Sequence, residues 1–413
     1  MHLLFIHQGF PGQYIHIVRE LAKNNRHTIT ALGLNSRHRD IPISVNYIKY
    51  EIEKGNLQGL HPWLTDIETK VIRGEACGRK AHELKNKGYE PDIICGHPGW
   101  GELLFLKEIW PKCPILNYQE FFYKAEGLDT GFDKEFGGHD QWTDKARSRM
   151  KGANCLLNLD IADWNVTPTH FQKSSFPEKW HDKISVLHDG INTTEAKPAK
   201  KKKVINIDNN TKIELDENMI TFINRRIEPY RGCHTFIRAI PEIQAKVQNS
   251  QIVIIGAETG VSYGAKCTDG EWKDIFLKEI EGQYDKSRVH FVGTISYNAF
   301  ITLMQRTDAH VYLTYPFVLS WSLLEAMSCE APVIGSETLP VMEVIKNGEN
   351  GILTDFFSSS MLAENISLLC KDKKLAKKLG KEARKTIVEK YELGMCVEDQ
   401  ISLIKLVAKG AVS

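Results

Sequence analysis

Hydrophobic residues along this chain fall into short runs that are separated by longer stretches with helical spacing. Such runs predict buried β-strands, and their alternation with helices predicts parallel sheets that are covered by helices on both faces. In the first half, strands are expected at Leu3–His7, Thr28–Gly33, Asn46–Tyr50, Ile93–Cys95, Ile115–Tyr118 and Ile184–His188. In the second half, they are expected at Ile220–Asn224, Gln251–Ile255, Val289–Val292, His310–Leu313, Val333–Gly335 and Gly351–Leu353.

The two series of strands predict two doubly wound α/β domains of Rossmann-like type, which would face one another across a cleft. A polar stretch separates them, and it is interpreted as a surface linker or a hairpin. The expected divisions are residues 1–195, 196–217, 218–392 and 393–413. Within the linker, the run Lys200–Lys203 favours a solvated loop, with contact to anionic lipid as the alternative.

The end of the chain has one long helical pattern, from Met361 to Lys409. Gly394 is expected to break it, because glycine is a poor helix former. This leaves a final helix over Cys396–Lys409, which we expect to pack back toward the first domain.

Composition narrows the classes of function. The 53 basic and 52 acidic residues give a formal charge of +1, so no strong field attracts nucleic acid. The nine cysteines occur singly without a C-x-x-C pair, which predicts a reducing compartment and neither a disulfide framework nor a zinc ribbon. No apolar stretch approaches the roughly 20 residues of a membrane span. A cytoplasmic protein is expected, with peripheral contact at the inner face of a membrane as a further option.

The segment from Tyr315 to Cys329 carries the clearest chemistry. A loop after a strand leads into a helix that is expected to begin around Ser320, Trp321 and Ser322. Free N–H groups at a helix start suit an anion such as a diphosphate. Glu325 follows just over one turn later among apolar residues, where its carboxylate needs a partner. Two ribose hydroxyls or a structural Arg or Lys are equally good partners.

A second segment runs from Asn224 to Gly232, after the first strand of the second domain. Its Arg226 and Arg231 lie five residues apart across a Pro-containing turn, so they could converge on one diphosphate with bidentate contacts. Taken alone, the pair is better interpreted as two solvated surface charges.

Together, the two segments resemble the family-four (group 1) retaining glycosyltransferases of GT-B fold. That family carries G-R-L-x-x-x-K-G and then E-x7-E running into L-E-A-M-A-C-G-x-P-V. Arg226 matches the family's arginine, Arg231 replaces its lysine, and Glu325 matches the second glutamate, which implies binding of the nucleotide ribose. Phe317 stands where the family has the first glutamate, which contacts the transferred sugar. At that place Phe317 would offer an apolar wall to a deoxy or amino sugar.

The loop His7–Gln13 follows the first strand, and its Gly12 permits backbone conformations and close approach that other residues forbid. The resemblance implies that Gly12 approaches the donor phosphate, and Gln13 in the same loop is assigned to the acceptor. His97 lies in a Gly-rich turn at a strand end, where it could donate to a sugar hydroxyl or carbonyl. A lone histidine at a strand end is more often structural, but the resemblance places a substrate-contacting histidine in this loop.

Tyr118 and Glu120 end the next strand and are interpreted as acceptor contacts, although Glu120 is equally well a buried structural carboxylate. The resemblance implies a transferase that moves a sugar from a nucleotide-diphosphate sugar to a glycan or lipid-linked glycan and keeps the anomeric configuration. Arg226, Arg231 and His97 would be the catalytic residues. The chain has no Asp-x-Asp cluster, so no metal and no other cofactor is expected. The alternatives are a non-catalytic partner subunit, a sugar-nucleotide epimerase and a phosphorylase.

Overall fold

The computed structural model describes residues 1–23, 26–36, 41–136, 142–200, 204–206, 212–214 and 218–412. The described chain forms two compact units. The first contains residues 1–130, 142–190 and 393–412, and the second contains residues 191–392 together with the short segment 131–136. Each unit has one parallel sheet as its centre, so the α/β architecture predicted from the hydrophobic pattern is confirmed.

The sheet of the first unit has seven parallel strands. Their order across the sheet is β5 (Val45–Lys49), β3 (Thr28–Gly33), β1 (His2–Ile6), β6 (Ile93–Gly96), β7 (Ile115–Tyr118), β8 (Trp164–Thr167) and β9 (Ile184–Val186). Two-residue strands β2 (Gly9–Phe10) and β4 (Asn35–Ser36) pair beside it. The helices of this unit are α1 (Ile15–Ala22), α2 (Thr65–Asn86), α3 (Leu106–Ile109), α4 (Trp142–Lys151), α5 (Ala153–Ile161), α6 (His170–Ser175) and α14 (Leu393–Ala408).

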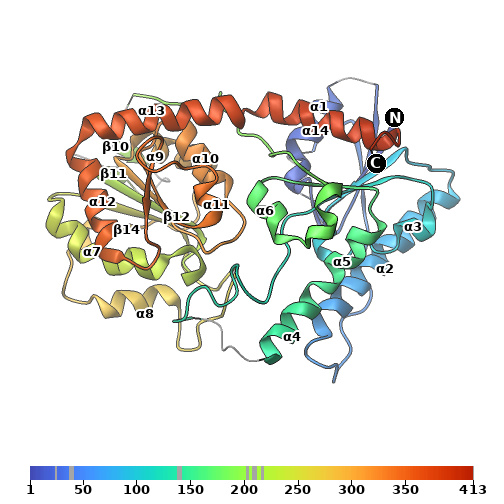
Figure 1. Ribbon diagram of the computed structural model, residues 1–413, viewed down its shortest axis with the longest axis horizontal. Coiled ribbons are helices and arrows are strands. Elements are labelled where there is room, and N and C mark those ends of the chain that lie inside the picture. The colour runs from blue at the N-terminus through green and yellow to red at the C-terminus, as the bar shows by residue number, and fades with distance from the viewer. Residues whose placement is uncertain are drawn as a thin grey trace. The chain divides into compact units, whose positions relative to one another are not determined.

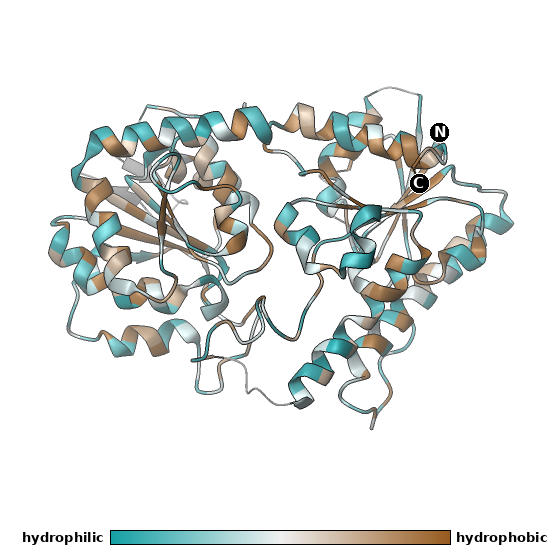
Figure 2. Cartoon of the chain, in the orientation of Figure 1, coloured by the Kyte–Doolittle hydropathy of each residue, from teal (hydrophilic) through white to brown (hydrophobic). Residues whose placement is uncertain are grey.

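Alternate side chains of β1 enter two separate cores. Leu3 and Phe5 pack with residues of α1 and α14 on one face, whereas Leu4 and Ile6 pack with residues of α2 and α3 on the other. Because both faces are covered, the strand is apolar throughout, and this is why it stands out in the sequence. Figure 2 shows the strands as mainly hydrophobic, while the helices around them carry hydrophilic residues on one side.

The second unit repeats this plan with six parallel strands. Their order is β14 (Val289–Phe291), β13 (Gln251–Ala257), β12 (Met219–Arg226), β15 (Ala309–Tyr312), β16 (Val333–Ser336) and β17 (Ile352–Thr354). The helices are α7 (Cys233–Lys246), α8 (Trp272–Glu279), α9 (Tyr297–Arg306), α10 (Trp321–Ser328), α11 (Leu339–Met342), α12 (Ser359–Lys371) and α13 (Lys373–Lys390). Helix α7 packs against α8 and α12, and α10 packs against α9 and α13, so the two sets cover opposite faces of the sheet (Figure 1).

All twelve predicted strands exist within a few residues of their expected places. The strand β8 was missed, because Trp164-Asn165-Val166-Thr167 is half polar and gives no apolar run. Its Asn165 is fully buried and accepts a hydrogen bond from the side chain of Gln119 at 3.0 Å. Burial of a polar side chain with its own partner cannot be recognised from spacing.

The predicted break of the last helix at Gly394 is wrong. The chain leaves helical geometry at Asp372 and again at Tyr391 and Glu392, and Gly394 lies in the first turn of α14. Tyr391 O accepts a hydrogen bond from Ile191 N at 2.7 Å, and Glu392 pairs with Ile191 in an isolated bridge. A tertiary backbone contact therefore ends α13, not a local helix breaker.

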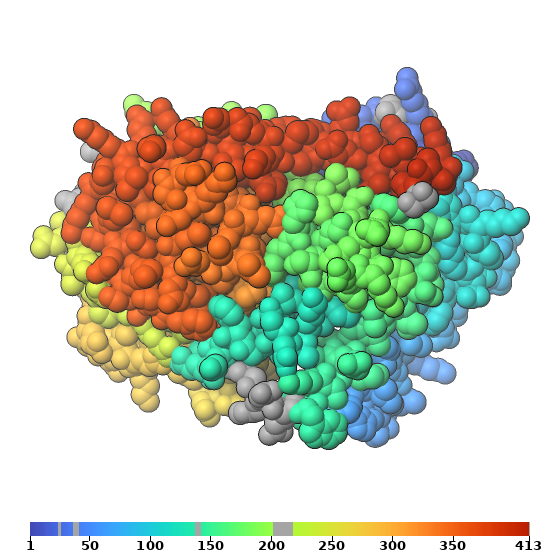
Figure 3. All heavy atoms as spheres, viewed as in Figure 1, coloured from blue at the N-terminus to red at the C-terminus, as the bar shows by residue number. Residues whose placement is uncertain are grey.

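In the region of the expected linker, the structure has an antiparallel pair of strands, β10 (Val204–Asn206) and β11 (Lys212–Glu214). This matches the hairpin alternative, although Lys201, Lys202 and Lys203 of the four-lysine run lie outside the described residues. A different basic surface is described on α13, whose exposed residues include Lys374, Lys377 and Lys381. Figure 3 shows this helix on the surface of the second unit.

Buried histidines make the stability of this chain depend on pH. Burial lowers the pKa of His188 to about 4 and that of His310 to about 3, from an ordinary value of 6.5. Between pH 6.5 and those values the unfolded chain binds more protons than the folded chain, so the free energy of unfolding decreases as the pH falls. Each histidine is expected to contribute up to about 1.4 kcal/mol per pH unit.

Urea unfolding midpoints measured from pH 7.5 to pH 4.5 test this expectation. His188→Asn keeps a side-chain acceptor for Gly190 N, which now donates to Nδ1 of His188 at 3.0 Å. This variant should show a shallower decrease than the native chain, and the difference between the two isolates His188. Equal slopes for the two proteins would contradict the assignment.

Candidate functional site

In the first unit, His97 and its neighbours form a buried cluster with several polar side chains near the strand ends. His97 follows β6 and caps a short helix at Pro98–Trp100, where Gly99 N donates to Nδ1 at 3.1 Å. A neutral ring must therefore carry its proton on Nε2. This atom is buried and has no hydrogen-bond partner among the described residues, since Glu120 Oε2 is 3.5 Å away. His97 thus holds a donor ready for a ligand oxygen.

His7 is a second histidine of this cluster, and it was overlooked in favour of Gly12. Gly9 N donates to His7 Nδ1 at 3.0 Å, and His7 Nε2 in turn donates to Gln13 Oε1 at 2.7 Å. Burial, with the nearby His97, lowers the pKa of His7 to about 4, so the ring is neutral at physiological pH. Gly12 has φ +50°, and a Cβ there would collide with the His7 ring, which explains the glycine.

A pattern in the sequence could have revealed His7. The motif His-x-Gly occurs at His7, His97 and His188, each following a strand of the first sheet. In all three places the glycine N–H donates to Nδ1 of the histidine two residues earlier. The repeated turn fixes the same tautomer each time and leaves Nε2 as the outward donor.

Glu120 joins the two histidines. Its Oε1 accepts from Gln13 Nε2 at 3.4 Å, and its Oε2 faces His97 Nε2. Burial opposes ionisation of Glu120, but His97, His7 and Gln13 together hold its pKa below the ordinary value. The half-buried side chain is therefore an ionised acceptor that is still reachable by a hydroxyl-bearing ligand.

Aromatic rings surround this cluster. The Trp100 ring stacks on His97 at a centroid distance of 4.3 Å and meets His7 edge-on at 4.9 Å. The Tyr118 ring also stacks on His97, at a centroid distance of 5.7 Å, and its hydroxyl donates to Asp189 Oδ2 at 2.9 Å. Tyr118 is buried and its hydroxyl already donates to Asp189, so its role in this structure is to pack against the cluster.

In the second unit, helix α10 begins at Trp321, as the sequence predicts for this region. Ser320 is its N-cap, and Ser320 Oγ accepts from Ser322 N at 3.3 Å. Ser320 N donates to Tyr312 Oη at 2.8 Å. The partial positive charge of the helix start is therefore directed at the region around Tyr312.

Arg231 lies at the same place. Its Nη1 donates to Thr314 Oγ1 at 2.7 Å, to Val318 O at 3.1 Å and to Tyr312 Oη at 3.4 Å. Tyr312 thus brings the guanidinium and the start of α10 together, since it accepts from both. Arg226 is held elsewhere, because its Nη1 donates to Thr259 O after β13. The hydrogen bonds described for the two arginines therefore go to different elements.

Phe317 does not form an open wall in this structure. It is 3% exposed, and its ring packs against Tyr230 at 5.1 Å and Tyr263 at 4.9 Å. The guanidinium carbon of Arg231 lies 5.5 Å from the ring centroids of both Phe317 and Tyr263. At this place the chain has a cation covered by two aromatic rings, an arrangement stabilised by the ring quadrupoles.

Glu325 has a neutral partner. The described hydrogen bond to its carboxylate comes from the hydroxyl of Tyr297, at the start of α9, and not from an Arg or Lys. Burial, with the nearby Glu195, raises the pKa of Glu325. A half-buried carboxylate with one neutral donor retains acceptor capacity, as binding of ribose hydroxyls requires.

The 131–136 segment is a part of the second unit that the sequence did not predict. Asp133 is buried, and its Oδ2 accepts from Tyr315 Oη at 2.9 Å and faces His234 Nε2 at 3.2 Å. The Phe132 ring packs on Tyr315 at 5.2 Å, and the Phe136 ring packs on His234 at 4.9 Å. The segment thereby supports the loop that leads to α10.

Among the described residues, Asp133, Glu135 and His234 form a group with the chemistry of metal ligands. Their ligand atoms are largely engaged by protein donors. Arg238 donates to both oxygens of Glu135, at 2.8 and 2.5 Å. Asp133 Oδ2 accepts from the hydroxyl of Tyr315 and lies 3.2 Å from His234 Nε2. The group fits a structural ion-pair network better than a metal centre.

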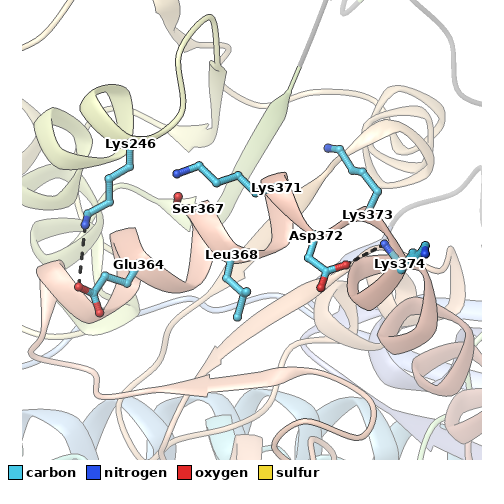
Figure 4. Close-up of a pocket in the computed structure, with 8 residues that line it drawn as sticks. All are labelled: Lys246, Glu364, Ser367, Leu368, Lys371, Asp372, Lys373 and Lys374. Atoms are coloured by element: carbon cyan, nitrogen blue, oxygen red, sulfur yellow. Dashed lines mark hydrogen bonds and ion pairs between the residues drawn. The ribbon is translucent and has the colours of Figure 1, made fainter.

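A groove of about 710 Å³ lies along α12 and the start of α13 (Figure 4). Four lysines line it, but Lys246 pairs with Glu242 and Glu364, and Lys373 pairs with Asp308 at 3.1 Å. These carboxylates reduce the positive charge available to an anion. The groove contains none of the residues of the two motifs, so it is not the candidate site.

The fold defines a class: two Rossmann-like parallel-sheet units are typical of GT-B glycosyltransferases, and in the second unit Arg231 and the start of α10 lie together. A sequence model described as "Glycosyl transferase family 4 group" matches residues 25–196, and one described as "Glycosyl transferases group 1" matches residues 204–386. The chain belongs to the glycosyltransferases, to the family 4 group through its first half and to group 1 through its second.

Individual relatives are distant. An uncharacterized glycosyltransferase of Methanocaldococcus jannaschii is 25% identical over 227 residues, which are 54% of this chain and 54% of that protein. The chain spans about half the length of the curated relatives it matches. HepE of Anabaena, solved with UDP and glucose, matches with a TM-score of 0.64 at 16% identity, over 98% of this chain and 99% of that chain. Sucrose-phosphate synthase of Thermosynechococcus elongatus matches with a TM-score of 0.71 at 15% identity, over 98% and 99%. These likenesses show the GT-B fold.

None of the helices in the described part of the chain combines the length and the hydropathy that crossing a bilayer requires.

Proposed function

We propose that this protein transfers a sugar from a nucleotide-diphosphate sugar to a glycan or lipid-linked glycan acceptor, with retention of configuration and without a metal. The observation that carries the proposal is the shared contact of Tyr312 with Arg231 and with the start of α10. It places a cation and a helix dipole at one point, next to a motif whose Glu325 has acceptor capacity for a ribose.

The relatives support the choice of substrates. HepE of Anabaena has been solved with UDP-glucose. A Campylobacter jejuni relative, 29% identical over 121 residues, is an N-acetylgalactosaminyltransferase that acts on a diphospho-undecaprenol glycan. A Staphylococcus aureus relative, 23% identical over 189 residues, is a capsular polysaccharide glycosyltransferase. By this analogy the acceptor belongs to surface polysaccharide or glycoconjugate assembly.

The chemistry assigns a role to the candidate residues of each unit. The bond from the anomeric carbon to the diphosphate breaks, and negative charge develops on the phosphate oxygens. Arg231, Arg226 and the start of α10 stabilise that charge. The acceptor hydroxyl attacks from the same face, and its proton passes to the departing phosphate, so no side-chain base is required. His97 Nε2 donates to an oxygen of the bound sugar, and Glu120, with Gln13, accepts from the acceptor.

A thermal-shift panel of UDP, GDP, dTDP, CMP and their sugar conjugates, each with and without chelator, tests the proposal. One diphosphate nucleotide should stabilise the protein, by about 2.7 kcal/mol at a concentration of 100 Kd, and chelator should leave the shift unchanged. Glu325→Ala should abolish most of the shift. A shift that disappears with chelator would overturn the metal-independent part of the proposal.

The burial of Phe317 in the place of the family's first glutamate favours a second candidate, a non-catalytic partner subunit. Such a protein should show no nucleotide-dependent shift with any member of the panel, and it should stabilise an active homologue when the two are mixed. A nucleotide shift together with sugar transfer by the purified chain would exclude this candidate.

A further inference from the structure

The loop between β13 and α8, residues 258–271, contacts both arginines of the candidate donor site. The carbonyl of Thr259 accepts the hydrogen bond from Arg226. Four residues later, the ring of Tyr263 lies over the guanidinium of Arg231 at 5.5 Å and packs on Phe317. Arg226 and Arg231 thus contact different residues, Thr259 and Tyr263, but these two residues lie in one short stretch of the same loop.

Glu228, between the two arginines in the sequence, holds this stretch of the loop. Its side chain is completely buried, and Oε2 accepts from Ser262 N at 2.7 Å and from Tyr263 N at 3.0 Å. Oε1 is also buried and has no hydrogen-bond partner among the described residues. Burial raises the pKa of Glu228, against the effect of those two N–H groups and the arginines.

A buried carboxylate with an unpaired oxygen is an unfavourable way to fix an ordinary surface loop. Arg226 and Arg231 favour the ionised form of Glu228, which connects this buried residue electrostatically with the arginine motif.

The glycines of the loop fit this arrangement. Gly260 has φ +68°, its N–H donates to Glu271 Oε2 at 2.8 Å, and a Cβ there would lie 3.2 Å from Arg226 Nη1. Gly264 has φ +75°, and a Cβ there would lie in ordinary contact with the Tyr230 ring at 3.4 Å. Both positions favour glycine because their positive φ strains a residue that has a side chain.

We propose that Glu228 is a positioning residue for the donor site: it fixes the 259–263 stretch so that Thr259 orients Arg226 and Tyr263 orients Arg231 toward the diphosphate. This inference rests on the proposed function. It adds a residue that touches no substrate and a loop whose backbone carries the effect.

The test compares Glu228→Ala and Glu228→Gln with the native protein, with Asp269→Asn at the exposed tip of the same loop as the matched control. Glu228→Ala removes the acceptor of the two loop N–H groups. It should raise the KM for the nucleotide-sugar, and the Kd for the free nucleotide diphosphate, by about 10-fold, while the KM for the acceptor changes less than about 2-fold. Glu228→Gln keeps one oxygen for the two N–H groups and should restore most of the affinity. Asp269→Asn should match the native protein.

A double-mutant cycle distinguishes positioning from general stabilisation. Because Glu228 acts through both arginines, the effect of Glu228→Ala on nucleotide affinity should be smaller in an Arg226→Ala background and should largely vanish when Arg226 and Arg231 are both replaced by alanine. Additive effects, or equal changes in the KM values for donor and acceptor, would overturn the inference. If Glu228→Ala does not fold, Tyr263→Ala replaces it and should raise the KM for the donor without raising the KM for the acceptor. An unchanged donor KM in Tyr263→Ala would also overturn the inference. Failure of the native protein to bind any nucleotide would instead refute the proposed function.

Discussion

Arg226→Ala is expected to reduce kcat/KM for sugar transfer by about 100-fold to 1000-fold while the free energy of unfolding stays nearly unchanged. Removal of one preorganised donor from a site of developing negative charge has effects of this size. The fold should tolerate the change, because the hydrogen bond described for the Arg226 side chain is one to the Thr259 carbonyl at the surface. The measurements are steady-state kinetics with the donor identified by the thermal-shift panel, and a denaturation curve.

Arg225→Ala is the matched control for this prediction. Arg225 is the preceding residue of β12 and is exposed, so its removal takes away the same charge from the same strand. It should change kcat/KM by less than about 3-fold if the effect of Arg226 depends on a specific contact with the diphosphate and not on net charge. An Arg226→Ala enzyme as active as the Arg225→Ala enzyme would remove Arg226 from the site.

Asp133→Ala should destabilise the second unit by about 3 to 5 kcal/mol. The carboxylate of Asp133 is buried between Tyr315 Oη and His234 Nε2, and its loss would leave both groups without this partner. Removal of one member of such a buried network has an effect of this magnitude. Chemical denaturation of the native and variant proteins, followed by circular dichroism, measures the change.

Two variants control this prediction. Lys134→Ala changes an exposed neighbour in the same segment and should leave the midpoint within the error of the measurement. Asp133→Asn keeps an oxygen that can accept from Tyr315 and should recover part of the loss. If Asp133→Ala unfolds at the same denaturant concentration as the native protein, the 131–136 segment does not support the loop that leads to α10.

The strands of both sheets, and their alternation with helices along the chain, could be predicted from the sequence. The reason is that a parallel strand covered on both faces has to be apolar at nearly every position. The runs at Leu3–Ile6 and Ile220–Phe222 are of this kind, and both are almost completely buried. The strand β8 could not be predicted, since half of its residues are polar, and its buried Asn165 is satisfied by Gln119, which follows the neighbouring strand β7.

The candidate site likewise has parts that the sequence predicts and parts that it does not. The start of α10 was predictable because its N-cap Ser320 is a local signal that acts within three residues. The positions of Arg231 and Phe317 were not, because the partners of Arg231 come from Tyr312, Thr314 and Val318, more than 80 residues along the chain. Residues that are remote in sequence meet only when the sheet brings their strands together.

The sequence alone therefore determined the class of fold, the two motifs and the family of this glycosyltransferase, because these depend on hydrophobic periodicity and on local residue spacing. Only the tertiary structure decided that Asp133 belongs to the second unit, that Tyr391 ends α13, and that Glu228 clamps the loop beside both arginines. Each of these is a contact between groups far apart in the chain, and it depends on hydrogen bonds that satisfy buried polar atoms, which no local pattern encodes.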